Sequence, residues 1–259
     1  MNSDELKLKV RSQFGASAEL YATSDVHAKG ESLSILLDLT KPNRDWYALD
    51  VATGAGHTAF TFAPHVKRVV AIDLTEEMAA KCNELALKRG VTNFTTKIAD
   101  AEDLPFDKSM FDLVTCRLAL HHFPNPSKAL KEFNRVLKPR GVLGFTDNIT
   151  VADEKAAKYH NTYEKLRDPS HHWAYSLDDL IQMFKTANFT PLEIQVISKE
   201  FEFNEWADRQ HVSENTKKHL REMMRNIPQI LENYLSPRWT TNSMYFSLRE
   251  AVIVAQKLL

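Results

Sequence analysis

Short apolar runs and amphipathic stretches alternate through the middle of the chain. Five of these runs are rich in apolar and β-branched residues, and each is only five or six residues long. They predict strands at residues 46–51, 68–72, 94–98, 111–116 and 142–147. The stretches between them carry helical spacing at residues 57–65, 75–89 and 125–137. Thr75 suits the N-cap of the second of these helices, and Gly90 suits its end.

This alternation of strands and helices predicts an α/β fold. Apolar strands joined by helices form a parallel sheet that is covered on both faces, and right-handed crossovers make it doubly wound. We expect a mostly parallel, seven-stranded sheet with helices on both faces. Ligands of such sheets bind beyond the carboxyl ends of the strands.

The two ends of the chain differ from the middle. The start is polar and helical, then a loop, then a helix at residues 30–39 that Pro42 closes. After the fifth strand we expect helices at 152–167 and 177–186, a strand at 191–197, helical periodicity at 202–235 and a closing strand at 249–257. We interpret this as one domain: an N-terminal helical cover (1–44), a core (45–200), a helical insert (201–242) and the closing strand (243–259).

Composition narrows the class of protein. The chain has 259 residues, and its net charge of −1 offers no general basic field for nucleic acid. No apolar run reaches membrane-spanning length, and the first residues lack the apolar segment of a signal peptide. Cys82 and Cys116 are too few for a disulfide scaffold. We expect a soluble cytoplasmic protein that binds neither nucleic acid nor membrane.

A glycine-bearing turn follows the first strand, in the sequence DVATGAGHTA from Asp50 to Ala59. Gly54, Gly56 and Ala59 match the G-x-G-x-x-A pattern of dinucleotide sites, and Asp73 follows at the end of the second strand. An NAD-dependent oxidoreductase is therefore one interpretation.

The acidic residues favour a different ligand. Asp50 lies at the base of the turn, and Asp73 and Asp100 follow the second and third strands. Three acids around one crevice would repel a pyrophosphate, and low dielectric would strengthen the repulsion. A ligand with positive charge suits this crevice better, and S-adenosylmethionine carries a sulfonium and an amine.

The order of motifs resembles that of class I S-adenosylmethionine-dependent methyltransferases. DVATGAG resembles their D-x-G-x-G-x-G loop, with Ala52 where the first glycine is expected. AIDLTEEM, ADAEDLPF and FDLVTCRLALHHF resemble the next motifs, and ALKEFNRVLKPRGVLGFTD resembles the branch that includes the ubiquinone/menaquinone C-methyltransferases. The resemblance covers residues 46–147 and implies a Rossmann-like methyltransferase fold.

The resemblance also implies roles for individual residues. Asp50 would brace the turn, while the backbone of Ala52, Gly54 and Gly56 would approach the methionine part of the cofactor. Asp73 would bind the ribose hydroxyls, Leu74 and Ala101 would contact the adenine, Asp100 would face its amino group, and Arg117 would meet the amino-acid end. The N-terminal segment would fold over the cofactor, with Tyr21 and His27 as candidates.

The methyl acceptor is less constrained. We expect a small organic molecule methylated on carbon or oxygen, and a non-catalytic S-adenosylmethionine-binding protein is the alternative. Candidates for the acceptor pocket follow the fourth and fifth strands and precede the helix at 177–186: His121, His122, Asp147, Asn148, His171 and His172. No metal is expected, because Arg117 stands near the position where magnesium-dependent relatives have an acid. The pattern predicts neither a catalytic residue nor an oligomeric state.

Overall fold

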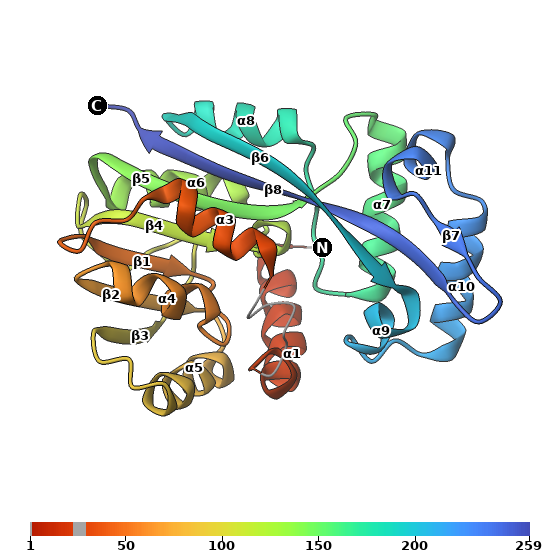
Figure 1. Cartoon of the computed structure of the whole chain (residues 1–259), viewed down its shortest axis with the longest axis horizontal. Helices are drawn as coiled ribbons and strands as arrows, with labels where there is room; N and C mark the ends of the chain where they lie inside the picture. Colours follow the sequence, from red (N-terminus) through yellow and green to blue (C-terminus); the bar gives the residue numbers. More distant parts are fainter. Residues whose placement is uncertain (1, 23–29) are drawn as a thin grey trace.

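The protein is described by a computed structural model that covers residues 2–22 and 30–259, with the side chains at 16–18 and 20–22 outside the described part. Figure 1 shows the arrangement of its elements. The strands are β1 (Tyr47–Val51), β2 (Arg68–Asp73), β3 (Phe94–Ile98), β4 (Phe111–Arg117), β5 (Leu137–Ile149), β6 (Phe189–Glu202), β7 (Arg238–Trp239) and β8 (Met244–Lys257).

Helices precede, separate and follow these strands. They are α1 (Ser3–Ala22), α3 (Glu31–Thr40), α4 (His57–Phe62), α5 (Glu76–Lys88), α6 (Pro126–Val136), α7 (Glu154–Arg167), α8 (Leu177–Thr186), α9 (Phe203–Asp208), α10 (Glu214–Arg225) and α11 (Gln229–Leu235), with short 3₁₀ turns η1 (Ala63–His65) and η2 (Leu120–His122). None of the described helices is long and apolar enough to cross a membrane.

The strands form one mixed sheet in the order β3-β2-β1-β4-β5-β8-β6. The first five run parallel, whereas β8 pairs antiparallel with both β5 and β6. The α/β, mostly parallel sheet is confirmed, but the described chain has eight strands rather than the expected seven. The additional strand is β7, a two-residue segment whose Arg238 and Trp239 pair with the start of β8.

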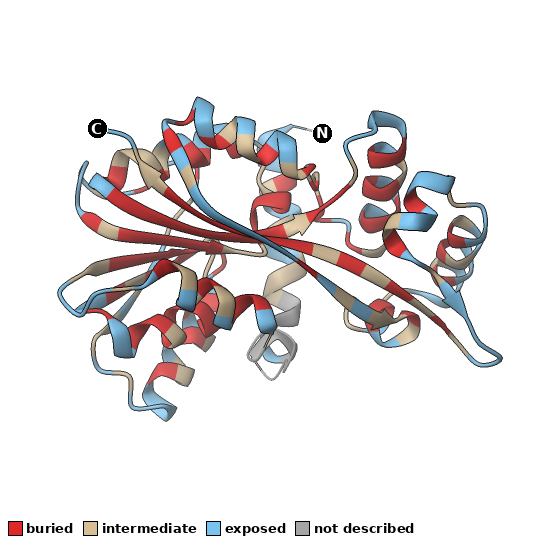
Figure 2. Ribbon diagram, turned by 45° about the horizontal axis from the view of Figure 1, so that its top comes forward, coloured by how far each residue is buried: buried red, intermediate tan, exposed pale blue. Residues whose placement is uncertain are grey.

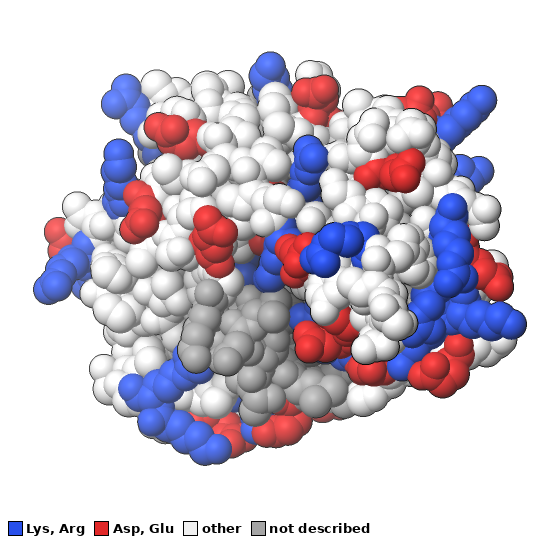
Figure 3. All heavy atoms as spheres, turned by 45° about the vertical axis from the view of Figure 1, so that its right-hand side comes forward, with Lys and Arg blue, Asp and Glu red and all other residues white. Residues whose placement is uncertain are grey.

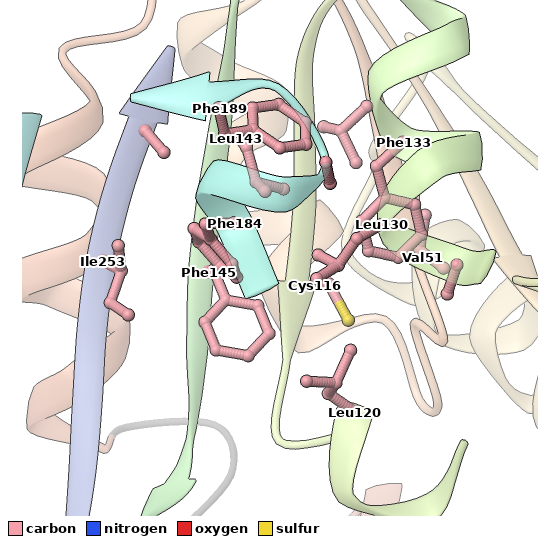
Figure 4. Close-up of a cluster of buried hydrophobic side chains, with 14 of the residues drawn as sticks. Val51, Cys116, Leu120, Leu130, Phe133, Leu143, Phe145, Phe184, Phe189 and Ile253 are labelled. Atoms are coloured by element: carbon pink, nitrogen blue, oxygen red, sulfur yellow. The ribbon is translucent and has the colours of Figure 1, made fainter. Parts of the chain in front are cut away.

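Helices bury both faces of the sheet. On one face, α6 and α8 pack on β4, β5 and β8, where Phe133, Phe145 and Phe184 are fully buried; Figure 4 shows this cluster. On the other face, α3 and α4 cover β1, β2 and the far side of β4. Neighbouring residues of β4 accordingly face opposite clusters, with Leu113 on one side and Val114 on the other. This two-sided burial fixes the strand ends that carry the turn.

β6 and β8 continue past the core. Residues 197–202 of β6 pair with residues 245–250 of β8, and we call this extension the β6–β8 ribbon. Figure 1 shows it running into a group formed by α7, α9, α10 and α11. A second cluster forms there around Trp206, whose ring stacks on Tyr163 of α7 at 5.3 Å. Thus α7, which we assigned to the core range 45–200, packs with the insert.

The burial pattern follows the same division. Figure 2 shows buried residues along most of β5 and β8 and along the inner sides of the surrounding helices, whereas β6 at the edge of the sheet is mostly exposed. On the face in Figure 3, acidic and basic side chains are interspersed at the surface, as a net charge of −1 permits. The free thiols of Cys82 and Cys116 are both buried.

The beginning of the chain departs from the expected loop. Helix α1 continues through residues 14–22, because this segment is rich in good helix formers and packs on α5. Gly15 permits close approach, since a Cβ there would lie 3.2 Å from the carboxylate of Glu77. An ion pair of 2.5 Å joins Glu19 to Lys81 of α5. The N-terminal cover is therefore docked by its first helix.

Candidate active site

The turn after β1 is shaped by three residues with left-handed backbone angles. Ala52 has φ 53°, Gly54 has φ 53° and Gly56 has φ 90°. Glycine adopts this region freely, whereas alanine there costs about 1–2 kcal/mol. Ala52 therefore holds a strained position at which a glycine would be relaxed. The turn is fixed by hydrogen bonds from Thr53 N to Ile72 O and from Gly56 N to Thr53 O, both 2.9 Å long.

The two glycines have different tasks. A Cβ at Gly54 would meet no heavy atom within 4 Å, and Gly54 lines a cavity. A Cβ at Gly56 would lie 2.4 Å from Cys82 Sγ and 2.6 Å from the ring of Phe60. Gly56 is not among the cavity-lining residues, so it serves the packing of α4 and α5 instead of the predicted approach to the cofactor.

Asp50 braces the turn from behind. Its side chain accepts hydrogen bonds from Thr53 Oγ1 at 2.5 Å and from Thr115 Oγ1 at 2.7 Å. Burial raises the pKa of Asp50 to about 6, against the lowering effect of these hydroxyls and of Arg117. Asp50 does not line the cavity. The carboxylate therefore contributes negative charge beneath the turn without touching its contents.

Asp73, unlike Asp50, faces the cavity. Its carboxylate accepts the backbone N–H of Gly54 at 2.8 Å and that of Thr75 at 2.9 Å. Burial raises the pKa of Asp73, and these backbone donors act in the opposite direction. A carboxylate offers about four lone-pair sites, so acceptor capacity remains toward the cavity. Asp73 thus joins the turn to the end of β2 and still presents an acceptor to a ligand.

The end of β3 carries Asp100, which is tied to the N-terminal helix. Lys7 of α1 donates to Asp100 Oδ2 at 2.7 Å and to Glu102 Oε2 at 2.9 Å. The other oxygen of Asp100 accepts the N–H of Glu102. Lys7, Val10 and Asp100 all line the cavity. The sequence pattern did not indicate Lys7, because nothing in a lone lysine of a polar helix marks its distant partner.

One cavity of about 540 Å³ extends from the turn to the β6–β8 ribbon, within the range of small-molecule sites. The turn end is bounded by α1, the turn itself and the ends of β2, β3 and β4. Of the cofactor candidates, those that line it are Ala52, Gly54, Asp73, Leu74, Asp100, Ala101 and Arg117. The side chain of Tyr21 and the whole of His27 lie outside the described part of the chain.

Arg117 stands between the two ends of the cavity. Its Nε donates to Thr58 Oγ1 of α4 at 3.0 Å. Burial lowers the pKa of Arg117, while the nearby carboxylates of Glu250 and Asp50 raise it. Arginine remains charged in proteins, so Arg117 brings a buried positive charge to this junction.

The acceptor candidates divide into two groups. His121, His122 and Asn148 line the cavity, whereas Asp147, His171 and His172 do not. His171 is buried and its Nε2 is hydrogen-bonded to Asn161 Oδ1 at 2.7 Å. His172 is partly exposed and borders a separate surface hollow. Sequence position places these residues near the sheet edge but does not say which way each side chain points.

Asp147 holds His121 in place through two hydrogen bonds. Its carboxylate is hydrogen-bonded to His121 Nδ1 and accepts the N–H of His121 at 2.9 Å. Burial lowers the pKa of His121, but the charge and hydrogen bond of Asp147 outweigh it, so the pKa is raised. Within the described residues, Nε2 of His121 has no hydrogen-bond partner. The pair therefore forms a histidine with one nitrogen fixed and the other available at the cavity.

His122 is a different kind of histidine. Its Nδ1 is 3.0 Å from the carbonyl oxygen of Ser170, and its ring meets Phe14 of α1 edge-on at 4.9 Å. Burial and the neighbouring His121 lower its pKa to about 4. His122 is consequently neutral at physiological pH, and it packs α1 against the cavity wall.

Several cavity residues were not singled out by the sequence patterns. They are carried by α7, by α9 and the loop after it, and by the ribbon: Glu164, Arg167, Asp168, Lys199, Phe201, Glu205, Trp206, Asp208, Arg209, Gln210, His211, Leu248 and Glu250. Burial raises the pKa of Glu164 to about 7. Among the described residues, no three His, Cys, Asp or Glu side chains meet as a metal site.

Comparison with known proteins identifies this arrangement. A family model described as "Methyltransferase domain" matches residues 49–145. The uncharacterized methyltransferase YcgJ of Bacillus subtilis (strain 168) is 34% identical over 196 residues, which cover 76% of this chain and 78% of that protein. The chain belongs to the S-adenosylmethionine-dependent methyltransferases. This confirms the resemblance seen in the motifs and sets aside the NAD-dependent oxidoreductase.

Two further comparisons show how far the methyltransferase likeness extends. A crystal structure of a Bacillus halodurans protein assigned as a methyltransferase has 34% identity and a TM-score of 0.85, covering 89% of this chain and 100% of that one. The ubiquinone/menaquinone biosynthesis C-methyltransferase UbiE of Brucella abortus (strain S19) is 38% identical over 100 residues, only 37% of each chain. The fold is thus shared almost throughout, whereas the likeness to UbiE covers a minority of the chain.

Proposed function

We propose that this methyltransferase binds S-adenosylmethionine at the turn between β1 and α4 and transfers its methyl group to a small organic acceptor beside His121. The observation that supports this most is Asp73, an acid on the cavity wall that is hydrogen-bonded to the turn. A dinucleotide would place its pyrophosphate against the same turn, where Asp50 adds a second buried negative charge.

The residues at the turn end fit the cofactor. The open space at Gly54 lets a ligand approach the backbone, and Asp73 offers acceptor sites to the ribose hydroxyls. Leu74, Ala101 and Met78 supply apolar wall for the adenine. Arg117 provides a positive charge for the carboxylate of the amino-acid end. The acids beneath and beside the turn suit the sulfonium and the amine.

When bound, S-adenosylmethionine supplies an activated methyl carbon that a nucleophile can attack directly. The work of the protein is then to hold the acceptor in line, to keep water out and to remove a proton where the acceptor arrives protonated. The walls contributed by α1, α7 and α9 enclose the cavity for the first two tasks.

His121 is suited to the third task. Asp147 fixes its Nδ1, so in the neutral ring the lone pair lies on Nε2, the nitrogen without a partner among the described residues. We therefore assign His121 as the general base and Asp147 as the residue that positions it. Its proton would come from a hydroxyl or from an acidic C–H of the acceptor, so that O-methylation and C-methylation are both within its reach.

The test begins with calorimetry. Purified protein is titrated with S-adenosylmethionine, S-adenosylhomocysteine and NAD, and we expect the first two to bind and NAD not to bind. Tight binding of NAD without either of the other ligands would refute the proposal. Turnover is then measured as S-adenosylhomocysteine release over a panel of phenols, hydroxy acids and activated methylene compounds. Binding without turnover on the whole panel would favour the non-catalytic alternative.

A further inference from the structure

The inner face of the β6–β8 ribbon forms the end of the cavity that is distant from the turn. Side chains alternate along paired strands, so Lys199 and Phe201 of β6 share one face with Leu248 and Glu250 of β8. All four line the cavity. Lys199 is paired directly with Leu248, and Glu250 follows two residues later on the same face. The ribbon therefore presents one cation, one anion and two apolar side chains inward.

The charges at this end are unequal. Lys199 Nζ lies 5.5 Å from the centroid of Phe201, and the guanidinium carbon of Arg209 lies 5.2 Å from the same ring. Arg117 adds a third cation, and both arginines lower the pKa of Lys199 after the larger effect of burial, whereas Glu250 raises it. Glu250 and Asp50 are the buried acids that act on these cations, and of the two only Glu250 lines the cavity.

No other acid near the ribbon forms an ion pair with Lys199 within the described residues. Asp208 and Glu205 of α9 line the cavity but are exposed. Asp208 forms an ion pair of 2.5 Å with Lys217, a residue that does not line the cavity. Glu164 and Asp168 belong to α7 and its end, where Arg167 and His121 are their neighbouring cations. In the part of the chain that the structure describes, Lys199 therefore has Glu250 as its one ion-pair partner, at 3.8 Å.

The contact between Lys199 and Glu250 leaves hydrogen-bonding capacity on both sides. Their nearest atoms, Lys199 Nζ and Glu250 Oε1, are 3.8 Å apart, which is too long for a hydrogen bond. Among the described residues Lys199 Nζ has no hydrogen-bond acceptor, and the buried Oε2 of Glu250 has no donor. Buried polar groups are nearly always paired, so Glu250 Oε2 requires a donor from a ligand. Lys199, whose side chain is 24% exposed, is open to an acceptor from the cavity.

We propose that the methyl acceptor carries a carboxylate, which Lys199 binds at the β6–β8 ribbon while Phe201 and Leu248 contact the apolar body of the acceptor. This rests on the proposed function and specifies its substrate class. Glu250 accepts a hydroxyl or N–H that lies beside the carboxylate. A small aromatic acid with a neighbouring hydroxyl group combines these features.

The proposal is tested with probes that differ only in charge. Protein saturated with S-adenosylhomocysteine is titrated with benzoate, salicylate and indole-3-acetate and with the corresponding neutral amides. We expect at least one carboxylate to bind at least about tenfold more tightly than its amide, since a hydrogen bond to a charged group has that worth. Equal binding of each acid and its amide, or no binding of any acid, overturns the proposal.

Variants at Lys199 test whether this residue causes the preference for the carboxylate. Lys199→Met keeps much of the side-chain length and removes the charge, and it should abolish the preference for the carboxylate, whereas Lys199→Arg should retain most of it. Lys218→Met, at an exposed lysine of α10 outside the cavity lining, is the matched control and should change nothing. A carboxylate preference that survives in Lys199→Met refutes the assignment.

Two readouts separate this proposal from the one on which it rests. S-adenosylhomocysteine binding and thermal stability are measured for every variant, and Lys199→Met should leave both unchanged. Failure of the wild-type protein to bind S-adenosylhomocysteine would refute the proposed function, and the titrations without it would then still show whether Lys199 selects carboxylates.

Discussion

The two ends of the cavity are built from different parts of the backbone. At the turn end, main-chain groups and two carboxylates from adjacent strand ends face the ligand, and Asp73 holds the N–H groups of Gly54 and Thr75. At the ribbon end, long side chains from α7, α9, β6 and β8 form the wall. The comparison shows that the turn end depends on local geometry, whereas the ribbon end depends on which side chains the insert brings together.

The largest expected effect concerns the junction between the two ends. His121→Ala should lower the rate of methyl transfer by about 10²–10⁴-fold, the usual contribution of a general base, while S-adenosylmethionine affinity stays within about twofold. Single-turnover kinetics and calorimetry measure the two quantities. His172→Ala, at a histidine outside the cavity, is the control and should behave as wild type. Unchanged turnover in His121→Ala would remove His121 from the mechanism.

Asp73 tests the turn end alone. Asp73→Ala should weaken S-adenosylmethionine binding by about 1.5–3 kcal/mol, because hydrogen bonds to a charged acceptor are lost. Asp73→Asn should recover part of this, since its amide oxygen can still accept from Gly54. The binding of carboxylate probes at the ribbon should stay the same in both variants. Normal cofactor affinity in a folded Asp73→Ala protein would contradict the ribose assignment.

The pH dependence of the rate tests the pairing of His121 with Asp147. A base acts when it is deprotonated, so kcat/KM should fall about tenfold per pH unit below the pKa of His121 and level off above it. Because Asp147 raises that pKa, the midpoint should lie above the ordinary histidine value of about 6.5. Asp147→Asn should move the midpoint to lower pH. A profile that is identical in both proteins would separate Asp147 from the titration.

The smallest expected effect concerns strain in the turn. Ala52→Gly should increase the free energy of unfolding by about 0.5–1 kcal/mol, because glycine relieves the left-handed φ but loses more entropy on folding. Ala55→Gly is the control: Ala55 is buried without a positive φ, so this change should destabilise the protein. Chemical denaturation measures both variants. A loss of stability in Ala52→Gly would show that the alanine methyl group contributes more by packing than it costs in strain.

The difference between the two ends also explains what the sequence could and could not predict. Asp50 and Asp73 lie at the ends of β1 and β2, and Asp100 lies two residues beyond β3, so the parallel sheet alone brings them to one edge. Lys199 and Glu250 lie 27 and 78 residues after His172, the last of the expected acceptor candidates, and only the register of β6 on β8 places them together. Their roles were missed because strand pairing across an insert has no local pattern.

The direction in which each side chain points sets a second limit on what the sequence can predict. His121 and His171 both follow expected elements, and only the structure distinguishes the one that reaches the cavity from the one that is bound to Asn161. Gly56 matched the family motif as well as Gly54 did, but its missing side chain makes room for Cys82. A motif therefore constrains the backbone path more firmly than it identifies the atoms that meet a ligand.

The position of β8 has a consequence for the order in which the protein forms during synthesis. β8 lies between β5 and β6 and is made after both, so β6 has no partner in the sheet until β8 leaves the ribosome. The turn end can assemble from β1 to β4 while translation continues, and the ribbon end cannot. During that interval the unpaired edge of β5 is open to other chains. Slow translation of residues 149–244, or a chaperone that binds the chain during that interval, would therefore affect the ribbon end of the cavity before it affects the turn end.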